Sequence, residues 1–510
     1  MLKEYALIFL IIFSGLGLRM HKLDANSFWY DEAESVITAA SPGRAISVLS
    51  KENYPGIFYK IFIHYWSRLG YGEGILRSSS VIFGLLSIAM AYILSAYLFG
   101  RPVALLSAAL VSFSPFHIYY SQELRMYAFL SFLSILCIYF FIRALREKRI
   151  VFYFGYVVSN LLNIYTHPVA FIWFLCQLLF LFLFRKRYMG QTKAWLWSNL
   201  AVSILLIPWL TAVFRLSCLL IMKDPRYYDI VSWILPVNLL SPIFTFKNFS
   251  VGYNAESLFY IFISAIFFFL FLRGAEKMDK EARRLSLLCL LTPVLVYFVV
   301  SLFRNCYVDR YFIASSIFFY IIIANGIYGL NRRLVPWVAA GLVLVNLAAA
   351  GNYFDNKLSK PRRWRMGVET RKDYRGAALY VLKNMRPGDV VFHTCRNTLV
   401  PFKYYFHYRF KGVNAGTGAK DGSNLLLTYG AERQLEAFRF LIPYYRLAPV
   451  DEKAVYSARR VWLVFSEWHF GEKNTAGIPE WRVVQELEKR SARINFSSFK
   501  GIDVYLYEKK

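Results

Sequence analysis

Acidic residues are scarce in this chain of 510 residues, and its cysteines and histidines show no organised spacing. It has 32 aspartates and glutamates against 60 lysines and arginines, so its formal net charge is +28. The six cysteines form no CxxC pair and the seven histidines show no metal-ligand spacing, which argues against a zinc site. We therefore expect no cofactor, and a catalytic divalent metal is the less favoured alternative.

Long hydrophobic runs make up most of the sequence. Hydrophobic residues account for 57% of it and aromatic residues for 19%. A window of about 20 residues identifies eleven hydrophobic segments, at 5–19, 79–99, 102–118, 126–143, 151–166, 168–184, 195–216, 256–272, 285–303, 311–330 and 334–350. No convincing cleavage site follows the first of them, so we interpret it as an uncleaved span. The sequence predicts an α-helical polytopic membrane protein with about eleven transmembrane helices.

The orientation follows from the basic residues between these segments. With a cytoplasmic N-terminus, five connections lie in the cytoplasm, and Lys and Arg are concentrated in them: near Arg101, and at 143–149, 185–193, 273–284 and 331–333. We expect a multi-pass protein of the cytoplasmic membrane, with residues 20–78 and everything after 351 on the outer side. Topology and anionic lipid account for much of the positive charge, so no nucleic-acid partner is expected.

The composition changes after about residue 351. Charged residues become more frequent and hydrophobic runs shorten to strand length, at 390–393, 460–465 and 504–507, while 373–382 has helical spacing. We expect two domains: a transmembrane catalytic domain at 1–351 with an outer loop at 20–78, and an extracytoplasmic α/β domain at 352–510.

Adjacent acidic residues follow the first hydrophobic segment, in the run Trp29-Tyr30-Asp31-Glu32. A charge close to hydrocarbon costs several kcal/mol unless it faces water, a partner or a substrate, so this pair is a functional candidate. The alternative is structural: Trp29 and Tyr30 form an interfacial aromatic belt and Asp31 caps a helix.

Further motifs accompany this pair in a fixed order. They are Asn53–Tyr59, Leu76-Arg77, Tyr120–Ala128, Arg310–Phe312 and Asp373–Ala378. Together they resemble the polyprenyl-phosphate-dependent glycosyltransferases of the GT-C type, and most closely the family 39 branch that is protein-mannosyltransferase-like and aminoarabinose-transferase-like. One element departs from that pattern, since Asn53-Tyr54-Pro55-Gly56 stands where members often have a His-Pro-Pro-like element.

The resemblance implies a reaction and assigns roles to the acidic pair. It implies transfer of a hexosyl or pentosyl group from a polyprenyl-phosphate donor to a lipid, glycan or protein acceptor at the outer face, with inversion. Asp31 would be the general base, and Glu32 would orient the acceptor or the sugar. Because the donor already carries a good leaving group, one base and a cationic clamp suffice for the chemistry.

Candidates for the donor phosphate site lie near the outer ends of the spans. Arg125, beside Glu123, could hold a phosphate through two hydrogen bonds, and Arg304 and Arg310 sit similarly near a later span. The full set of candidates is Arg125, Glu123, Arg304, Arg310, Tyr311, Lys51 and Tyr54. Alternatively, each arginine extends to the interface or pairs with a neighbouring acid, Glu123 or Asp309.

Two other functions compete with the enzyme. In a transporter or flippase of lipid-linked sugars, Asp31 and Glu32 would be ion-coupling carboxylates, but they lie in a loop and the sequence has no detectable inverted repeat. In a non-catalytic scaffold, the outer domain would bind cell-envelope partners.

Overall fold

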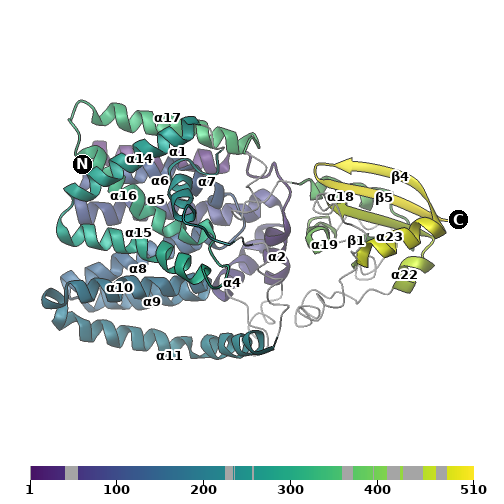
Figure 1. Cartoon of the computed structure of the whole chain (residues 1–510), viewed down its shortest axis with the longest axis horizontal. Helices are drawn as coiled ribbons and strands as arrows, with labels where there is room; N and C mark the ends of the chain where they lie inside the picture. The colour runs from purple at the N-terminus through teal and green to yellow at the C-terminus, as the bar shows by residue number, and fades with distance from the viewer. Residues whose placement is uncertain are drawn as a thin grey trace.

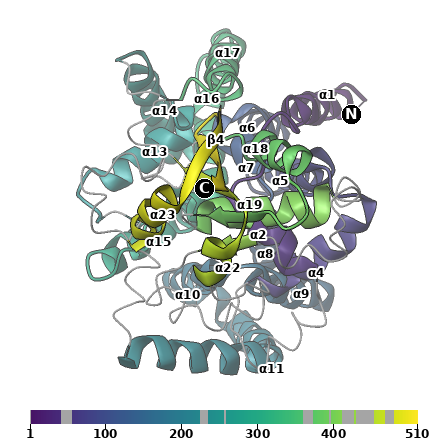
Figure 2. The same cartoon turned by 90° about the vertical axis from the view of Figure 1, so that its right-hand side faces the viewer.

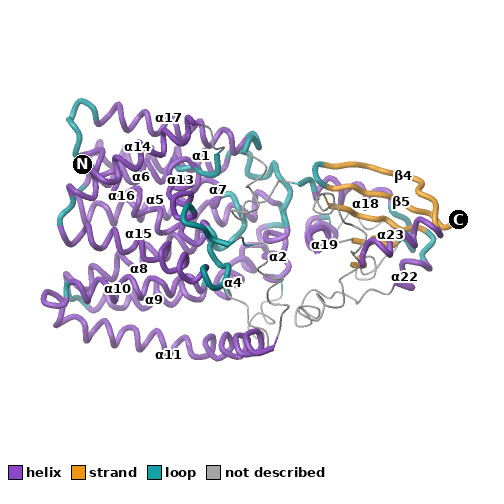
Figure 3. The backbone as a smooth tube through the Cα atoms, in the orientation of Figure 1, coloured by secondary structure: helices purple, strands orange, loops and turns teal. Residues whose placement is uncertain are grey.

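The computed structural model describes residues 2–40, 56–223, 234, 236–254, 258–358, 372–393, 396–410, 426–428, 452–466 and 479–510. Long helices run side by side in one bundle, and a smaller part with a β-sheet lies at one end of it (Figures 1 and 3). The N-terminus is at the opposite end of the bundle. The predicted fold class is therefore confirmed.

All eleven hydrophobic segments of the sequence lie on helices. These are α1 (Leu2–Met20), α5 (Glu73–Phe99), α6 (Arg101–Phe113) with α7 (Pro115–Ser121), α8 (Tyr127–Glu147), α9 (Ile150–Thr166), α10 (Ile172–Leu183), α11 (Arg185–Lys223), α14 (Leu258–Lys277), α15 (Lys280–Ser301), α16 (Ile313–Tyr328) and α17 (Val335–Phe354). Among the described residues, seven helices are long and apolar enough to cross a membrane, or eight when the bent pair α6 and α7 is one span. The count of eleven crossings stays a prediction.

Shorter helices at the sheet end of the bundle connect the long ones. They are α2 (Tyr30–Ala39), α4 (Ile57–Trp66), η1 (Ser67–Leu69), η2 (Pro168–Phe171), α13 (Ser241–Val251) and η3 (Asp309–Phe312). Seen from that end, the sheet-containing part lies in front of the bundle, over α2 and α8 (Figure 2). The outer loop predicted at 20–78 therefore contains helices of its own.

A break between α6 and α7 precedes the loop that carries Glu123 and Arg125. Pro115 follows Ser114, whose hydroxyl accepts a hydrogen bond from the His117 amide at 3.2 Å, and the two helices meet at 59°. The break leaves backbone carbonyls without helical partners. Buried Arg19 of α1 donates to the carbonyls of Ser112 (2.9 Å) and Val111 (3.3 Å), and so ties the first span to this bend.

The sheet-containing part begins with α18 (Tyr374–Asn384). A five-stranded sheet follows in the order β2-β1-β3-β5-β4, in which β1 pairs in parallel with β2 and β3, and β5 pairs antiparallel with β3 and β4. Its strands are β1 (Val390–His393), β2 (Leu426–Thr428), β3 (Arg460–Ser466), β4 (Ser491–Phe499) and β5 (Ile502–Lys509). Its other helices are α19 (Arg396–Tyr404), η6 (Tyr405–Arg409), α22 (Glu452–Ser457) and α23 (Pro479–Arg490). The three strands predicted from the sequence are β1, β3 and β5.

The two parts meet through a buried carboxylate at the start of α5. Glu73 pairs with Arg375 (3.1 Å) and Arg409 (3.3 Å), and it accepts a hydrogen bond from the Tyr405 hydroxyl at 3.0 Å. The same hydroxyl accepts a hydrogen bond from the Phe28 amide at 2.8 Å. The loop that precedes Asp31 is thus held directly by the C-terminal part.

Candidate functional site

Asp31 and Glu32 lie in the first turn of α2. Trp29 occupies the N-cap position and makes no side-chain cap hydrogen bond. Asp31 is therefore not the capping residue, which excludes that part of the structural alternative. Carboxylates in a first helical turn interact favourably with the helix dipole, which helps α2 to begin here.

The two neighbouring carboxylates have very different surroundings. Glu32 is buried and forms two 2.7 Å hydrogen bonds with the guanidinium group of Arg77, while its Oε1 also accepts from the Leu124 amide at 2.9 Å. Asp31 keeps 18% of its side chain exposed. The bonds of Glu32 leave it little capacity to orient a substrate, so its geometry supports a positioning role rather than the one expected from the sequence.

Two arginines face Asp31, Arg125 from the loop between α7 and α8 and Arg310 from η3. Its Oδ2 lies 3.7 Å from an Nη of Arg310 and 3.9 Å from Nε of Arg125. Arg125 also donates to the backbone oxygen of Asp31 at 3.0 Å and to the hydroxyl of Ser35 at 3.2 Å. The structure therefore brings together Asp31, Arg125 and Arg310, three of the residues that the sequence singles out.

Arg310 points toward Asp31 because the residue before it is held elsewhere. Asp309 accepts hydrogen bonds from Thr245 (2.5 Å) and from Asn248 (2.7 Å), both on α13. The guanidinium of Arg310 lies over the ring of Tyr127, 5.2 Å from its centroid. Such a cation–π contact helps to orient a charge in a partly dry site.

Glu123 lies in the loop between α7 and α8, beside the same cluster. Its side chain is buried, and neither carboxyl oxygen has a hydrogen-bond partner in the described part of the chain. Burial raises the pKa of Glu123 to about 8; the negative charges of Glu32 and Asp31 add to this effect, while Arg310 and Arg125 oppose it.

Two charged residues near Asp31 were missed by the sequence reasoning. Glu34 lies one helical turn after Asp31, with an oxygen 3.5 Å from Arg125. Lys60 of α4 is buried; burial lowers the pKa of Lys60 to about 7, an effect that Glu34 partly offsets and Arg125 adds to. The spacing of Asp31 and Glu34 could have predicted a shared helix face, whereas Lys60 stands alone in an apolar run.

The remaining candidates are Tyr311, which lies within electrostatic reach of Arg310, Arg125 and Asp31, the exposed Arg304, and two residues outside the described ranges. Arg304 is exposed beyond the end of α15. Tyr311 packs its ring against His167 and Tyr297, at centroid distances of 5.2 and 5.7 Å. Lys51 and Tyr54 lie outside the described residues. Within the described ranges, no group of three or more His, Cys, Asp or Glu side chains could hold a metal ion.

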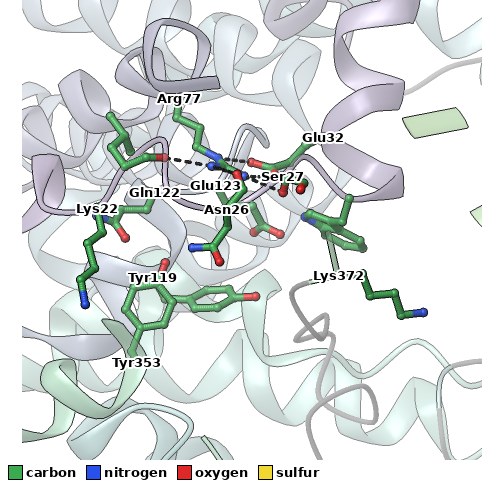
Figure 4. A pocket seen from close by; sticks show the side chains of 12 residues that line it. Lys22, Asn26, Ser27, Glu32, Arg77, Tyr119, Gln122, Glu123, Tyr353 and Lys372 are labelled. Carbon is green, nitrogen blue, oxygen red and sulfur yellow. Dashed lines mark hydrogen bonds and ion pairs between the residues drawn. The ribbon is translucent and has the colours of Figure 1, made fainter. Parts of the chain in front are cut away.

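A pocket opens beside Glu123 (Figure 4). The first loop lines it with Lys22, Asn26 and Trp29, and the bundle contributes residues that include Tyr119 and Tyr353. The Glu32–Arg77 pair and Lys372 complete the polar wall. Asp31, Arg125 and Arg310 do not line this pocket, but Glu123 lies within electrostatic reach of all three.

Comparison with known proteins agrees with this architecture. Residues 56–211 match the model of a family described as dolichyl-phosphate-mannose-protein mannosyltransferase. A search of curated protein sequences finds no match.

Solved structures share the fold over nearly the whole chain. ArnT from Cupriavidus metallidurans in the apo state is 12% identical with a TM-score of 0.63, covering 98% of this chain and 97% of that one. The same protein bound to undecaprenyl phosphate gives a TM-score of 0.62 at 12% identity, with the same coverage. The oligosaccharyltransferase AglB from Archaeoglobus fulgidus, in complex with an inhibitory peptide and a dolichol-phosphate, is 11% identical with a TM-score of 0.52, covering 99% of this chain and 74% of that one. The resemblance to GT-C glycosyltransferases is confirmed.

Proposed function

We propose that this multi-pass membrane protein is an inverting glycosyltransferase. It takes a hexosyl or pentosyl group from a polyprenyl-phosphate donor and transfers it to a lipid, glycan or protein acceptor on the outer face of the cytoplasmic membrane. The helical region 1–351 carries the chemistry, and the α/β part at 352–510 holds the first loop in place. The observation that carries the proposal is the contact of the partly exposed Asp31 carboxylate with two arginines.

The chemistry needs one proton acceptor and a site for the developing phosphate charge. Asp31 takes the proton from the acceptor nucleophile, whose lone pair forms the new bond to the anomeric carbon. The bond from that carbon to the phosphate oxygen breaks, and its electron pair leaves on the phosphate. A single displacement of this kind inverts the anomeric centre.

Arg125 and Arg310 stabilise the leaving phosphate. Their distances of 3.9 and 3.7 Å from the Asp31 carboxylate are longer than the 2.7 Å bonds between Arg77 and Glu32. A bound phosphate therefore competes readily with Asp31 for the two guanidinium groups and leaves the carboxylate able to act as a base. Fixed cations aimed at a developing charge often supply the largest single contribution to catalysis.

The test is single-turnover transfer by the purified protein in proteoliposomes. Polyprenyl-phosphate sugars labelled in the sugar are supplied with a cell-envelope lipid and glycan extract as acceptor. The proposal expects cleavage of the phosphate–sugar bond and labelled product. Movement of the intact donor across the bilayer without cleavage would instead identify a flippase, and binding without either event would identify a scaffold.

A further inference from the structure

The pocket beside Glu123 has an unsatisfied hydrogen-bonding group in its wall. Glu123 is 5% exposed, and within the described residues no donor reaches either of its carboxyl oxygens. Leaving a buried polar atom without a partner destabilises a folded protein. Most such atoms in folded proteins are paired. A buried carboxyl that lines a pocket is therefore suited to accept a hydrogen bond from a ligand.

The sequence assigned Glu123 to the donor phosphate, but two nearby arginines, Arg125 and Arg310, suit a phosphate better. Those arginines do not line the pocket. Glu123 therefore lies where a second substrate would approach, within electrostatic reach of the Asp31 carboxylate.

The opposite wall of the pocket is aromatic. Tyr119 and Tyr353 meet edge to face, with ring centroids 5.1 Å apart, and both lie below Glu123 in Figure 4. Gln122 is fixed at the wall because its amide nitrogen donates to the carbonyls of Arg19 (2.9 Å) and His21 (2.7 Å). Aromatic rings opposite fixed polar groups suit a carbohydrate, which has an apolar ring face and hydroxyl groups at its edge.

The volume of the pocket and the charges around it restrict the class of ligand further. The pocket measures about 40 Å³, whereas a single water needs at least about 10–15 Å³. It therefore admits one or two hydroxyl groups while the ring stays at the opening. Two lysines lie on opposite sides of the pocket in Figure 4. Lys22 is 44% exposed and pairs with Asp355 at 3.2 Å, whereas Lys372 is buried and donates to the Ser466 hydroxyl at 2.8 Å. The exposed Lys22 attracts an anionic ligand and disfavours a cationic amine.

We propose that this pocket is the acceptor site and that its ligand is an anionic carbohydrate, one hydroxyl of which donates a hydrogen bond to Glu123. Lys22 attracts the anionic group, and the tyrosine pair supports the sugar ring. Glu123 then acts as a positioning residue that holds the acceptor beside Asp31. This assignment rests on the proposed glycosyltransferase function, which it deepens by naming the acceptor chemistry.

The test measures two kinds of binding to the full-length protein in nanodiscs. Binding of glucose 6-phosphate to the pocket is measured by saturation-transfer NMR. A polyprenyl phosphate is the probe of the site formed by Arg125 and Arg310. Glu123→Ala and Tyr353→Ala should each weaken glucose 6-phosphate binding by about tenfold or more and leave polyprenyl phosphate binding within about twofold. Arg310→Ala should instead weaken polyprenyl phosphate binding by about tenfold or more and leave glucose 6-phosphate binding within about twofold.

Two lysine variants test whether charge contributes to ligand binding. Lys22→Ala should weaken binding of glucose 6-phosphate but not of glucose. The matched control is Lys357→Ala, because Lys357 also pairs with Asp355 (3.1 Å) but does not line the pocket. Melting temperatures are compared so that only folded variants are interpreted.

Two results would overturn the acceptor assignment. One is no detectable glucose 6-phosphate binding by the wild type, and the other is loss of polyprenyl phosphate binding, with sugar binding retained, in Glu123→Ala. Failure of the glycosyltransferase proposal is a separate observation, namely that the wild type cleaves no polyprenyl-phosphate sugar although the pocket probe binds.

Discussion

Arg77 holds Glu32 through two parallel 2.7 Å hydrogen bonds in a site where both side chains are almost fully buried. The same guanidinium donates to the carbonyls of Leu23 (2.9 Å) and Asn26 (2.8 Å). One residue of α5 therefore fixes both the loop before Asp31 and the helix that carries it. Burying a charge pair brings little net stability, so we interpret this pair as a device that positions its neighbour Asp31.

Replacing one partner of this pair should destabilise the protein more than replacing both. Arg77→Met leaves the Glu32 carboxylate buried without its partner and should destabilise the protein by about 3–5 kcal/mol. The double variant Arg77→Met with Glu32→Leu should recover part of that loss in a thermal unfolding assay, yet transfer should stay low in both. Arg101→Met is the matched control, since Arg101 pairs with Glu4 at the surface. Equal stability of the single and double variants would contradict the buried-pair argument.

Asp31→Asn separates binding from chemistry. The substitution preserves size and removes the ability to accept a proton, so single-turnover transfer should fall by roughly 10²- to 10⁴-fold while polyprenyl phosphate still binds. Asp31→Glu should also be impaired, since a displacement of about 1 Å can cost about 100-fold. Asp24→Asn, in the exposed part of the same loop, is the control. Turnover near the wild-type rate in Asp31→Asn would remove Asp31 from the role of base.

Substitutions of Arg310 test whether this residue binds the donor phosphate. Arg310→Ala should weaken polyprenyl phosphate binding and reduce transfer by about 100-fold or more. Arg310→Lys should recover only part of the activity, because a point charge does not reproduce the planar fork of a guanidinium. Arg304→Ala is the comparison, since Arg304 is an exposed arginine near the same span. If Arg310→Ala keeps normal donor binding and rate, Arg310 is a structural anchor.

The sequence predicted the helices better than the contacts that join them. Each hydrophobic segment became a helix because a bilayer requires internally hydrogen-bonded backbone. Close packing of α14 on α16 was not predictable from composition: a Cβ on Gly274 or Gly326 would collide with a backbone oxygen of the other helix. Strand β4 escaped notice because most of its residues are exposed and no apolar alternation identifies it.

Charge alone identified candidate site residues in the sequence, whereas their pairing could not be predicted from it. Asp31, Arg125 and Arg310 were recognisable as charged residues at the ends of spans. The pairing of Glu32 with Arg77 spans 45 positions in the sequence, so no local pattern could show which acid remains accessible. Lys60 looked like an isolated charge, since its neighbour Glu34 lies on a different helix.

The orientation in the membrane leads to a further prediction. A reporter fused after Lys510 and one placed within residues 20–40 should both report the outer side, because the C-terminal part contacts the first loop directly through Tyr405 and Phe28. A reporter between Arg185 and Lys193 should report the cytoplasm. Opposite sides for the first two reporters would contradict the described contact, and reversal of all three would overturn the orientation but not the fold.

The buried carboxyl of Glu123 should make stability depend on pH in a defined direction. In the folded protein the pKa of Glu123 is raised from an ordinary value of 4.5 to about 8, chiefly by burial. Between these values the folded state binds more protons than the unfolded state, so the contribution of this group to stability decreases as pH rises. Below about pH 4.5 both states are protonated and the group imposes no such cost, whereas above about pH 8 the cost is complete.

Glu123→Gln removes this dependence and keeps the size of the side chain. Its melting temperature should therefore exceed that of the wild type by roughly 2 °C or more at pH 8.5, and the difference should shrink toward zero near pH 5. Comparing the two proteins at each pH cancels the opposite contribution of Lys60, whose lowered pKa is common to both. Glu4→Gln, at a half-exposed position on α1 where Glu4 pairs with Arg101, controls for the loss of one carboxylate. A melting-temperature difference that stays constant from pH 5 to pH 8.5 would show that Glu123 carries the same charge in both states, and the unpaired carboxyl would then have to be ionised in the folded protein.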